Sequence, residues 1–189
     1  MSEPKCKPED YIQFLIASPS RFSCVEAERV QPQTAGRAAH DSFRNLLLRL
    51  AGSSDDLWGE AKAQIGDLRR GALVLDDSTL DKPKGEHIEL VSSHYSGKHQ
   101  GVVRGINLLT LLWTDGDRHI PSDWRIYHKA SDGLTKNAHF RALLRAAHGR
   151  GLEPEAVCFD AWYASVDNLK LVRQLGWKFW HGSIGRAGG

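Results

Sequence analysis

Two short apolar runs in this sequence each end in carboxylates. Asp76 and Asp77 follow the run Ala72–Leu75, and Asp160 follows the run Ala156–Phe159. A continuous apolar run of this length is typical of a buried strand, and rigid strand ends can hold carboxylates from neighbouring strands at one point. Mg²⁺ and Mn²⁺ prefer such oxygen ligands. The pattern therefore indicates a site for divalent cations.

The chemistry expected of such a site is phosphoryl transfer. A pair of divalent ions held ~3.5–4 Å apart activates the attacking oxygen and stabilises the leaving oxygen when a phosphodiester bond is cleaved or transferred. A second interpretation stays open, because aspartate at a strand end also commonly forms a turn or caps the next helix. Successive strand residues point to opposite faces, so only one of Asp76 and Asp77 is expected to reach the site.

The first seventy residues have the pattern of short amphipathic helices. Three kinds of signal mark the helix ends: proline in a first turn, serine three positions before an acidic residue, and glycine after the last apolar residue. Between them apolar residues recur every three or four positions, as on the buried face of a helix. We expect a small helical bundle, with helices starting at Pro8, after Ser23 and at His40, the last running to Leu50, and a fourth capped by Ser54 and ending at Gly66.

From residue 71 onward, β-rich runs dominate and two helical patterns separate the last of them. Asp115-Gly116 is a typical hairpin turn, and Pro121 indicates an edge strand. The order predicts an α/β (α+β) fold with a mixed sheet and flanking helices. The expected strands are Ala72–Leu75, His87–Tyr95, Val102–Thr114, His119–Tyr127, Ala156–Phe159 and Trp177–Trp180, and the expected helices are Thr135–His148 and the segment from Ser165 to Leu175.

Composition limits the class of protein. The chain has 189 residues, 41% of them hydrophobic, and a net charge of +2, so a soluble cytoplasmic protein is expected and a strong basic excess for nucleic acid is lacking. No apolar run approaches the ~20 residues of a membrane helix, so no membrane partner is expected. Cys6, Cys24 and Cys158 are scattered, which predicts reduced thiols, with Cys158 buried.

Three segments carry a resemblance to a known family. They are LVLDDSTLDKPKG, HYSGKHQGVVRGINLLTLLWTDGDRHIPSDWRIY and VCFDAWYASVDNLKLVRQLGWKFW. In this order they resemble the catalytic domain of bacterial insertion-sequence transposases of the DDE class, and the resemblance covers roughly residues 5 to 180. It implies an N-terminal helical region over residues 1–70, an RNase-H-like catalytic core over 71–180 that is incomplete, and a Gly-rich tail over 181–189.

The resemblance also implies site residues, cofactors and partners. The acidic-Asp-Ser/Thr-Thr motif of the family falls on Asp76 to Thr79, so Asp77 matches the first catalytic metal ligand and Asp76 is the alternative. Asp160 matches the second catalytic aspartate. The implied cofactor is Mg²⁺ or Mn²⁺ in a two-metal site. The implied partners are the terminal repeats of the insertion sequence and a second protein chain, in a homodimer or in a pair with full-length transposase.

The third acidic ligand of the family has no counterpart. In the family it is a glutamate within a Tyr, Arg, Glu, Lys signature on a later helix, and Glu153 and Glu155, which flank Pro154 in a loop, are poor substitutes. We expect that the reading frame is lost near His181 and that this chain alone cleaves DNA little or not at all. The alternative function is a non-catalytic DNA-binding or regulatory remnant of a transposase.

The remaining candidates are basic, histidine and aromatic residues. Lysines and arginines in loops and on a helix edge are candidates for contacts with DNA phosphates, although such residues are commonly only solvated. A zinc cluster of His94, His99, Asp115, Asp117 and His119 is a weak alternative. Most tryptophans are expected in the core, with Trp162 and Tyr163 exposed beside Asp160. The candidate DNA-binding residues are Lys82, Lys84, Lys98, Arg141 and Arg145.

Overall fold

The computed structural model describes residues 5–19, 22–32, 36–50, 52–97 and 99–182. Contacts within the chain divide it into two compact units, Met1–Gly52 and Ser53–Gly189. None of the helices in the described ranges is long and apolar enough to cross a membrane. Lys98 and the tail beyond residue 182 lie outside the described residues, so the predictions for them are not tested.

The first unit contains three short helices. Pro8 occupies the first position of its helix, and Ser23 caps the next, with its Oγ accepting a hydrogen bond from the backbone N–H of Glu26 at 3.2 Å. Both helix starts were predicted from the same residues. The core of this unit is formed by Cys6, Phe14, Ala27, Ala38, Phe43 and Leu46. Its helices are α1 (Pro8–Ala17), α2 (Cys24–Val30) and α3 (His40–Arg49).

The fourth helix, α4 (Ser54–Lys62), packs against the sheet of the second unit. Its cap is Ser53 and not Ser54 as predicted, because the Ser53 Oγ accepts from Asp56 N–H at 3.1 Å while the Asp56 carboxylate accepts from Ser53 N–H at 2.8 Å. The helix also ends at Lys62, before the predicted Gly66, although Ile65 is still buried. Contacts within the chain group α4 with the sheet. The domain boundary at residue 70, which the family resemblance implies, stays a prediction.

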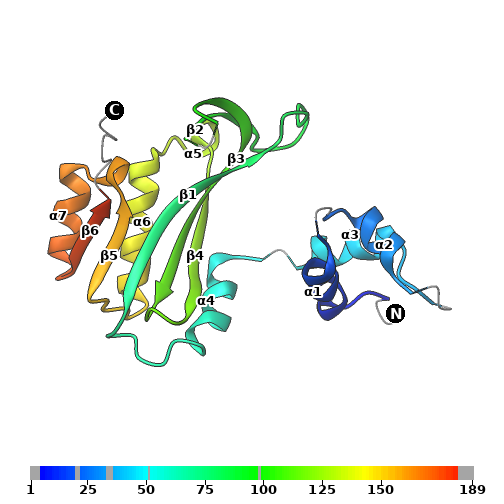
Figure 1. Ribbon diagram of the computed structural model, residues 1–189, viewed down its shortest axis with the longest axis horizontal. Coiled ribbons are helices and arrows are strands. Elements are labelled where there is room, and N and C mark those ends of the chain that lie inside the picture. Colours follow the sequence, from blue (N-terminus) through cyan, green and yellow to red (C-terminus); the bar gives the residue numbers. More distant parts are fainter. Residues whose placement is uncertain (1–4, 20–21, 33–35, 51, 98, 183–189) are drawn as a thin grey trace, which may run out of the picture. The chain divides into compact units, whose positions relative to one another are not determined.

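The second unit is built on a six-stranded mixed sheet (Figure 1). The order along the sheet is β2-β3-β1-β5-β6, with β4 paired to the later part of β3. The central strand β1 runs antiparallel to β3 and parallel to β5. This arrangement confirms the predicted α/β fold class. The strands are β1 (Ala72–Asp81), β2 (Ser92–Ser96), β3 (Gly101–Thr114), β4 (His119–Tyr127), β5 (Ala156–Asp160) and β6 (Lys178–Gly182).

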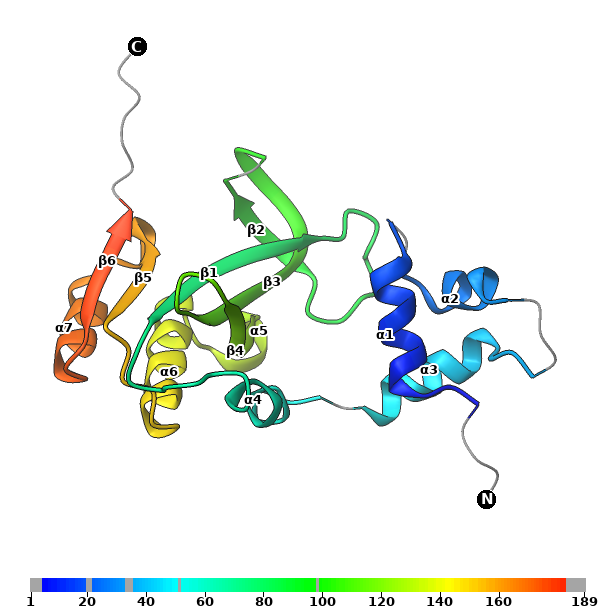
Figure 2. The same cartoon turned by 60° about the horizontal axis from the view of Figure 1, so that its bottom comes forward.

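Two helices, α6 (Lys136–Gly149) and α7 (Val166–Gln174), cover one side of this sheet, as Figure 2 shows. Helix α6 packs against β3, β4 and α7, and α7 packs against β6. Ser165 caps α7 as predicted, and Thr135, predicted as the first helical residue, is the cap of α6; both hydroxyls accept from backbone N–H groups three positions on. A short helix α5 (Lys129–Asp132) precedes α6, and a 3₁₀ turn, η1 (Ala161–Tyr163), follows β5.

The burial of β1 alternates along the strand. Leu73 and Leu75 are fully buried against α6 and α7, whereas Ala72 and Val74 are half-buried. The run Ala72–Leu75 is therefore buried on one face and half-buried on the other. Cys158 lies beside Val74 in the register and is likewise half-buried, which corrects the prediction that it is buried. The three cysteines are free thiols, as predicted.

The second strand is shorter than predicted. Residues before Ser92 form turns, with Leu90 at a positive φ of 64°, so the expected strand His87–Tyr95 is reduced to β2. Conversely, β1 extends to Asp81 because Asp76–Asp81 pair with the long strand β3. Pro121 lies at a register shift of β4, which within the described residues pairs only with β3, so the predicted edge position is confirmed. Trp180 was expected in the core, but its side chain on β6 is 75% exposed.

Gly105 sets how closely β1 and β3 approach. A Cβ atom at this position would lie 2.5 Å from the Leu80 carbonyl oxygen and 2.8 Å from the Thr79 Cγ2. We expect Gly105→Ala to lower the free energy of unfolding by about 1–3 kcal/mol, because the backbone must shift to relieve this overlap. Urea denaturation measures this. Gly101→Ala is the control on the same strand, since its Cβ would have an ordinary contact at 3.7 Å, and an equal loss in both variants would contradict the account.

Candidate functional site

Strand alternation places the two adjacent carboxylates of β1 on opposite faces. Asp77 continues the parity of the buried residues Leu73 and Leu75, so it points to the face that α6 covers. Asp76 has the opposite parity and is exposed. The first aspartate therefore meets solvent, while the second meets the start of α6.

Three donors surround the carboxylate of Asp77. The Tyr163 hydroxyl donates to Oδ1 at 2.7 Å, and the Asn107 amide and the Lys136 ammonium donate to Oδ2 at 2.9 and 2.7 Å. They come from η1, β3 and the first turn of α6. With three hydrogen bonds, two of them from groups with few rotatable bonds, the orientation of this carboxylate is fixed.

The charge state of Asp77 follows from these donors. Burial by itself raises the pKa of this carboxyl, but the hydrogen bonds from Lys136, Asn107 and Tyr163 outweigh burial and leave its pKa below the ordinary value of 3.8. The Tyr163 hydroxyl responds in the opposite sense, because burial and then its hydrogen bond to Asp77 raise its pKa. At neutral pH Asp77 is an anion and Tyr163 a neutral donor.

Asp76 and Asp160 complete a group of negative charges. Partial burial and the nearby negative charges of Asp77 and Asp160 raise the pKa of Asp76, against the hydrogen bond that it accepts from Asp77 N–H. The charges of all three aspartates also raise the pKa of Tyr163. Asp160 caps η1 by accepting from Trp162 N–H at 3.4 Å, so the helix-start role weighed for it is present. Its carboxylate remains exposed.

The three carboxylates line a single cavity of about 1150 Å³. Lys136, Tyr127 and Trp162 line it too, and Trp162 is 57% exposed at its edge. The Lys136 Nζ lies 5.6 Å from the ring centroid of Tyr127 and 5.7 Å from that of Trp162. The cavity thus combines clustered negative charge, one lysine ammonium and exposed aromatic surface.

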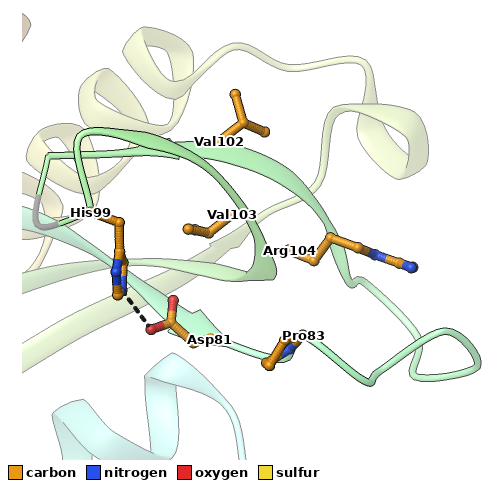
Figure 3. Close-up of a pocket in the computed structure, with 6 residues that line it drawn as sticks. All are labelled: Asp81, Pro83, His99, Val102, Val103 and Arg104. Atoms are coloured by element: carbon orange, nitrogen blue, oxygen red, sulfur yellow. Dashed lines mark hydrogen bonds and ion pairs between the residues drawn. The ribbon is translucent and has the colours of Figure 1, made fainter.

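A smaller cavity of about 360 Å³ lies at the far end of β1 (Figure 3). Asp81 and His99 line both cavities, which therefore meet at this pair. The His99 Nε2 lies 3.0 Å from the Asp81 Oδ2, and the guanidinium of Arg104 points away from them. The larger cavity therefore extends along β1 from Asp160 toward the hairpin of β2 and β3.

A sequence model of the family described as DDE superfamily endonuclease matches residues 5–182. The chain belongs to this family. The resemblance to the DDE class that three sequence segments carry is thereby confirmed. A search of curated proteins finds no match to this chain.

Solved structures of transposases align with this chain at low sequence identity. A piggyBac transposase synaptic complex with hairpin DNA aligns with 100% of this chain and 45% of its own, at 12% identity and a TM-score of 0.48. A Mos1 transposase paired-end complex with the left transposon end aligns with 95% of this chain and 59% of its own, at 10% identity and a TM-score of 0.31. This chain thus spans about half the length of these transposases.

The DDE endonuclease family generally uses divalent metal ions, and the aspartates in the middle of β1 and at the end of β5 fit that requirement in their chemistry. Asp76, Asp77 and Asp160 offer carboxylate oxygens around one cavity. Partial burial and then the charges of Asp77 and Asp160 raise the pKa of Asp76. In their described orientations, however, no three His, Cys, Asp or Glu side chains of the described ranges form a metal-binding group. Asp76 and Asp160 are turned to backbone N–H groups instead.

The predicted DNA-binding residues of this chain lie on different elements. Lys82 and Lys84 are exposed in the loop after β1, and Arg145 is exposed on α6. Arg141 is half-buried and donates to Asn168 Oδ1 at 2.9 Å, so it joins α6 to α7. Among the interactions described for these ranges, the side chains of Lys82, Lys84 and Arg145 have no hydrogen-bond or ion-pair partner.

The prediction for Tyr163 is wrong, and the alternative of a zinc cluster is contradicted. Tyr163 is 1% exposed and bonded to Asp77, whereas it was expected to be exposed beside Trp162. The proposed zinc cluster does not form within the described residues, because its histidines have separate partners. His94 contacts Ser92, His99 contacts Asp81 and His119 contacts Thr114.

Sequence reasoning missed Lys136 and Asn107. A lysine in the first turn of a helix opposes the helix dipole, and α6 has no acidic residue in that turn, so Lys136 was a detectable anomaly. Asn107 is a polar residue at an inward position of an apolar strand and is fully buried. Its amide turns its N–H₂ to Asp77, which leaves Asn107 Oδ1 without a hydrogen-bond partner in the described structure. The negative charge of Asp77 explains both residues.

Removal of one donor tests how the carboxylate of Asp77 is held. Tyr163→Phe keeps the buried ring and removes the hydroxyl that donates to Asp77, and we expect it to lower the free energy of unfolding by about 1–3 kcal/mol. Urea denaturation at pH 7 provides the measurement. The control is Tyr95→Phe, at a position that is 68% exposed, for which a change within about 0.5 kcal/mol is expected. Equal effects of the two variants would contradict the proposed support.

The lowered pKa of Asp77 predicts how stability depends on pH. The folded protein binds a proton at Asp77 less readily than the unfolded chain does, so this carboxyl stabilises the fold above pH 3.8, its ordinary pKa, and that contribution is lost as pH falls further. The difference in unfolding free energy between the unchanged protein and Asp77→Asn should therefore shrink between pH 6 and about pH 3. The exposed Glu86→Gln serves as control. A pH-independent difference for Asp77→Asn would contradict the account.

Proposed function

We propose that this chain is the DNA-processing part of a transposase, which cleaves and transfers phosphodiester bonds at the ends of an insertion sequence. The observation that carries the proposal is that Asp77 and Asp160, which lie on separate strands of a DDE-family sheet, line one cavity together with Asp76. Carboxylates from two rigid strands that face a shared space are what a divalent cation needs.

In this proposal Asp77 and Asp160 bind the cations, with Asp76 as the alternative ligand on β1. Bound Mg²⁺ or Mn²⁺ ions, as a pair, supply activation of the attacking oxygen and stabilisation of the leaving oxygen. Tyr163 and Asn107 orient Asp77, since each donates to its carboxylate. Asp160 is oriented by the start of η1, because its Oδ1 accepts from Trp162 N–H.

DNA is the proposed partner, through the terminal repeats of the element. The cavity is open along β1, and the exposed ring of Trp162 at its edge offers a surface on which a base can stack. Lys82 and Lys84 lie in the loop after β1 and are proposed to contact phosphates. Pairing with a second transposase chain and a cytoplasmic location belong to the same proposal.

A non-catalytic DNA-binding or regulatory role is the second candidate. One observation favours it: the described residues contain no group of three carboxylate or other ligands arranged for a metal ion. Asp77 is paired instead with Lys136 at 2.7 Å. The two candidates share DNA binding and differ in whether the cavity takes up a divalent cation.

A titration with Mn²⁺ distinguishes them. Paramagnetic Mn²⁺ broadens NMR signals near its binding site, so the transposase proposal predicts early loss of the signals around Asp77 and Asp160. We expect Asp77→Asn and Asp160→Asn to abolish this loss, because each removes a charged ligand. The titration is repeated with double-stranded DNA, which is expected to shift signals around Trp162 and to leave the order of broadening unchanged.

Asp81→Asn is the matched control for this titration. Asp81 is also a β1 carboxylate, but it is paired with His99 at the far end of the cavity. The proposal predicts that Mn²⁺ broadens the NMR signals around Asp77 and Asp160 in this variant as it does in the unchanged protein. Broadening that starts at Asp81, or that survives both Asp77→Asn and Asp160→Asn, would reject the proposed metal site and favour the non-catalytic candidate.

A further inference from the structure

Lys136 is the cation closest to the proposed metal ligand. Its Nζ lies 2.7 Å from the Asp77 Oδ2, and the two side chains are 16% and 22% exposed. The ammonium also lies near the rings of Tyr127 and Trp162, at 5.6 and 5.7 Å from their centroids, within the range of cation–π attraction. One carboxylate oxygen of Asp77 is therefore already paired with a positive charge.

The position of Lys136 in its helix is electrostatically unfavourable. It is the first residue of α6, where unpaired backbone N–H groups give the helix end a partial positive charge. No acidic residue of the first turn compensates it. The ammonium is thus held at this end by Asp77 and the two aromatic rings, against the repulsion of the helix end.

A divalent cation competes for the same oxygen under better conditions. It carries twice the charge of the ammonium, and it also attracts Asp76 and Asp160, which line the same cavity. Neither of these two aspartates has an ion-pair partner among those found in the described structure. The lysine side chain is flexible, and the adjoining cavity of about 1150 Å³ gives its ammonium room to move.

We propose that Lys136 is an internal counter-ion, which neutralises Asp77 when no metal is bound and is displaced into the cavity when a divalent cation binds. This inference rests on the proposed function, in which Asp77 is a metal ligand. The displaced ammonium then faces the space proposed for DNA, where a phosphate oxygen is its natural partner. Metal binding and DNA binding are therefore coupled, and each strengthens the other.

The test measures the affinity of the full chain for Mn²⁺ from the electron paramagnetic resonance signal of the free ion. Lys136→Gln removes the competing charge and keeps a side chain of similar length, so it is expected to bind Mn²⁺ about tenfold more tightly, the equivalent of one charge-assisted hydrogen bond. Lys136→Arg keeps the charge and is expected to bind no more tightly than the unchanged protein. Lys170→Gln, at an exposed position of α7, controls for the change in net charge.

A second measurement guards against a variant that is merely less stable. Without metal, Lys136→Gln leaves Asp77 without its cation and should melt at a lower temperature than the unchanged protein. Addition of Mn²⁺ should raise its melting temperature by more than that of the unchanged protein, because the ion replaces the missing charge. A variant that is only damaged would show the lower melting temperature without the larger metal effect.

The outcomes separate this inference from the proposed function. If the unchanged protein binds Mn²⁺ and Asp77→Asn does not, while Lys136→Gln binds no more tightly than the unchanged protein, displacement is rejected and the metal site stands. Equal tightening in Lys170→Gln would also reject displacement, since it would show a general charge effect. If neither the unchanged protein nor Lys136→Gln binds Mn²⁺ through Asp77, the proposed function itself is rejected.

Discussion

The carboxylate of Asp77 is the point on which the arrangement of this unit depends. It lies on the central strand, on the face that α6 covers, and a charge in that position needs compensating donors. Those donors come from three elements that are distant in sequence: Asn107 on β3, Lys136 on α6 and Tyr163 on η1. The close pairing of β1 and β3 at Gly105, the capped start of α6 and the turn after β5 each bring one of these donors into place.

The same interaction explains the electrostatics of the cavity. Three aspartates lie close together on two parallel neighbouring strands. Partial burial and then the charges of Asp77 and Asp160 raise the pKa of Asp76. One lysine offsets part of this charge at Asp77. The rest of the cavity is rich in carboxylate oxygens, negatively charged and next to the exposed Trp162. Such a space favours a cation over a neutral small molecule. It also favours an aromatic group, or an anion that the bound cation attracts. Membership of the DDE endonuclease family gives this chemistry its context.

Local signals predicted most of the fold. Thr135 and Ser165 marked the starts of α6 and α7, and apolar runs ending in aspartate located β1 and β5. The choice of Asp77 over Asp76 as a site residue came from the family resemblance and stays a prediction. Local signals failed where pairing decides the structure. The extension of β1 to Asp81 is imposed by β3, and a run of loosely alternating residues before Ser92 has no partner strand within the described residues and forms turns.

The contacts around Asp77 were not predictable from spacing. Asn107 and Lys136 lie 30 and 59 positions from their partner, and no periodicity links residues at such separations. Tyr163 was expected to be exposed, whereas η1 turns that ring inward, where it stacks with Phe140. Two unusual polar residues were the signals in the sequence that pointed to these contacts. They are the lysine in the first turn of α6 and the buried asparagine in the apolar strand β3.

The central claim is that Asp77 exchanges one cation for another. A crystal structure with Mn²⁺ tests it most directly, because the anomalous scattering of manganese locates the ion independently of the protein atoms. The account predicts a manganese peak bound by the carboxylates of Asp77 and Asp160, with the Lys136 ammonium moved away into the cavity. A Lys136 ammonium still hydrogen-bonded to Asp77, with manganese elsewhere, would contradict it.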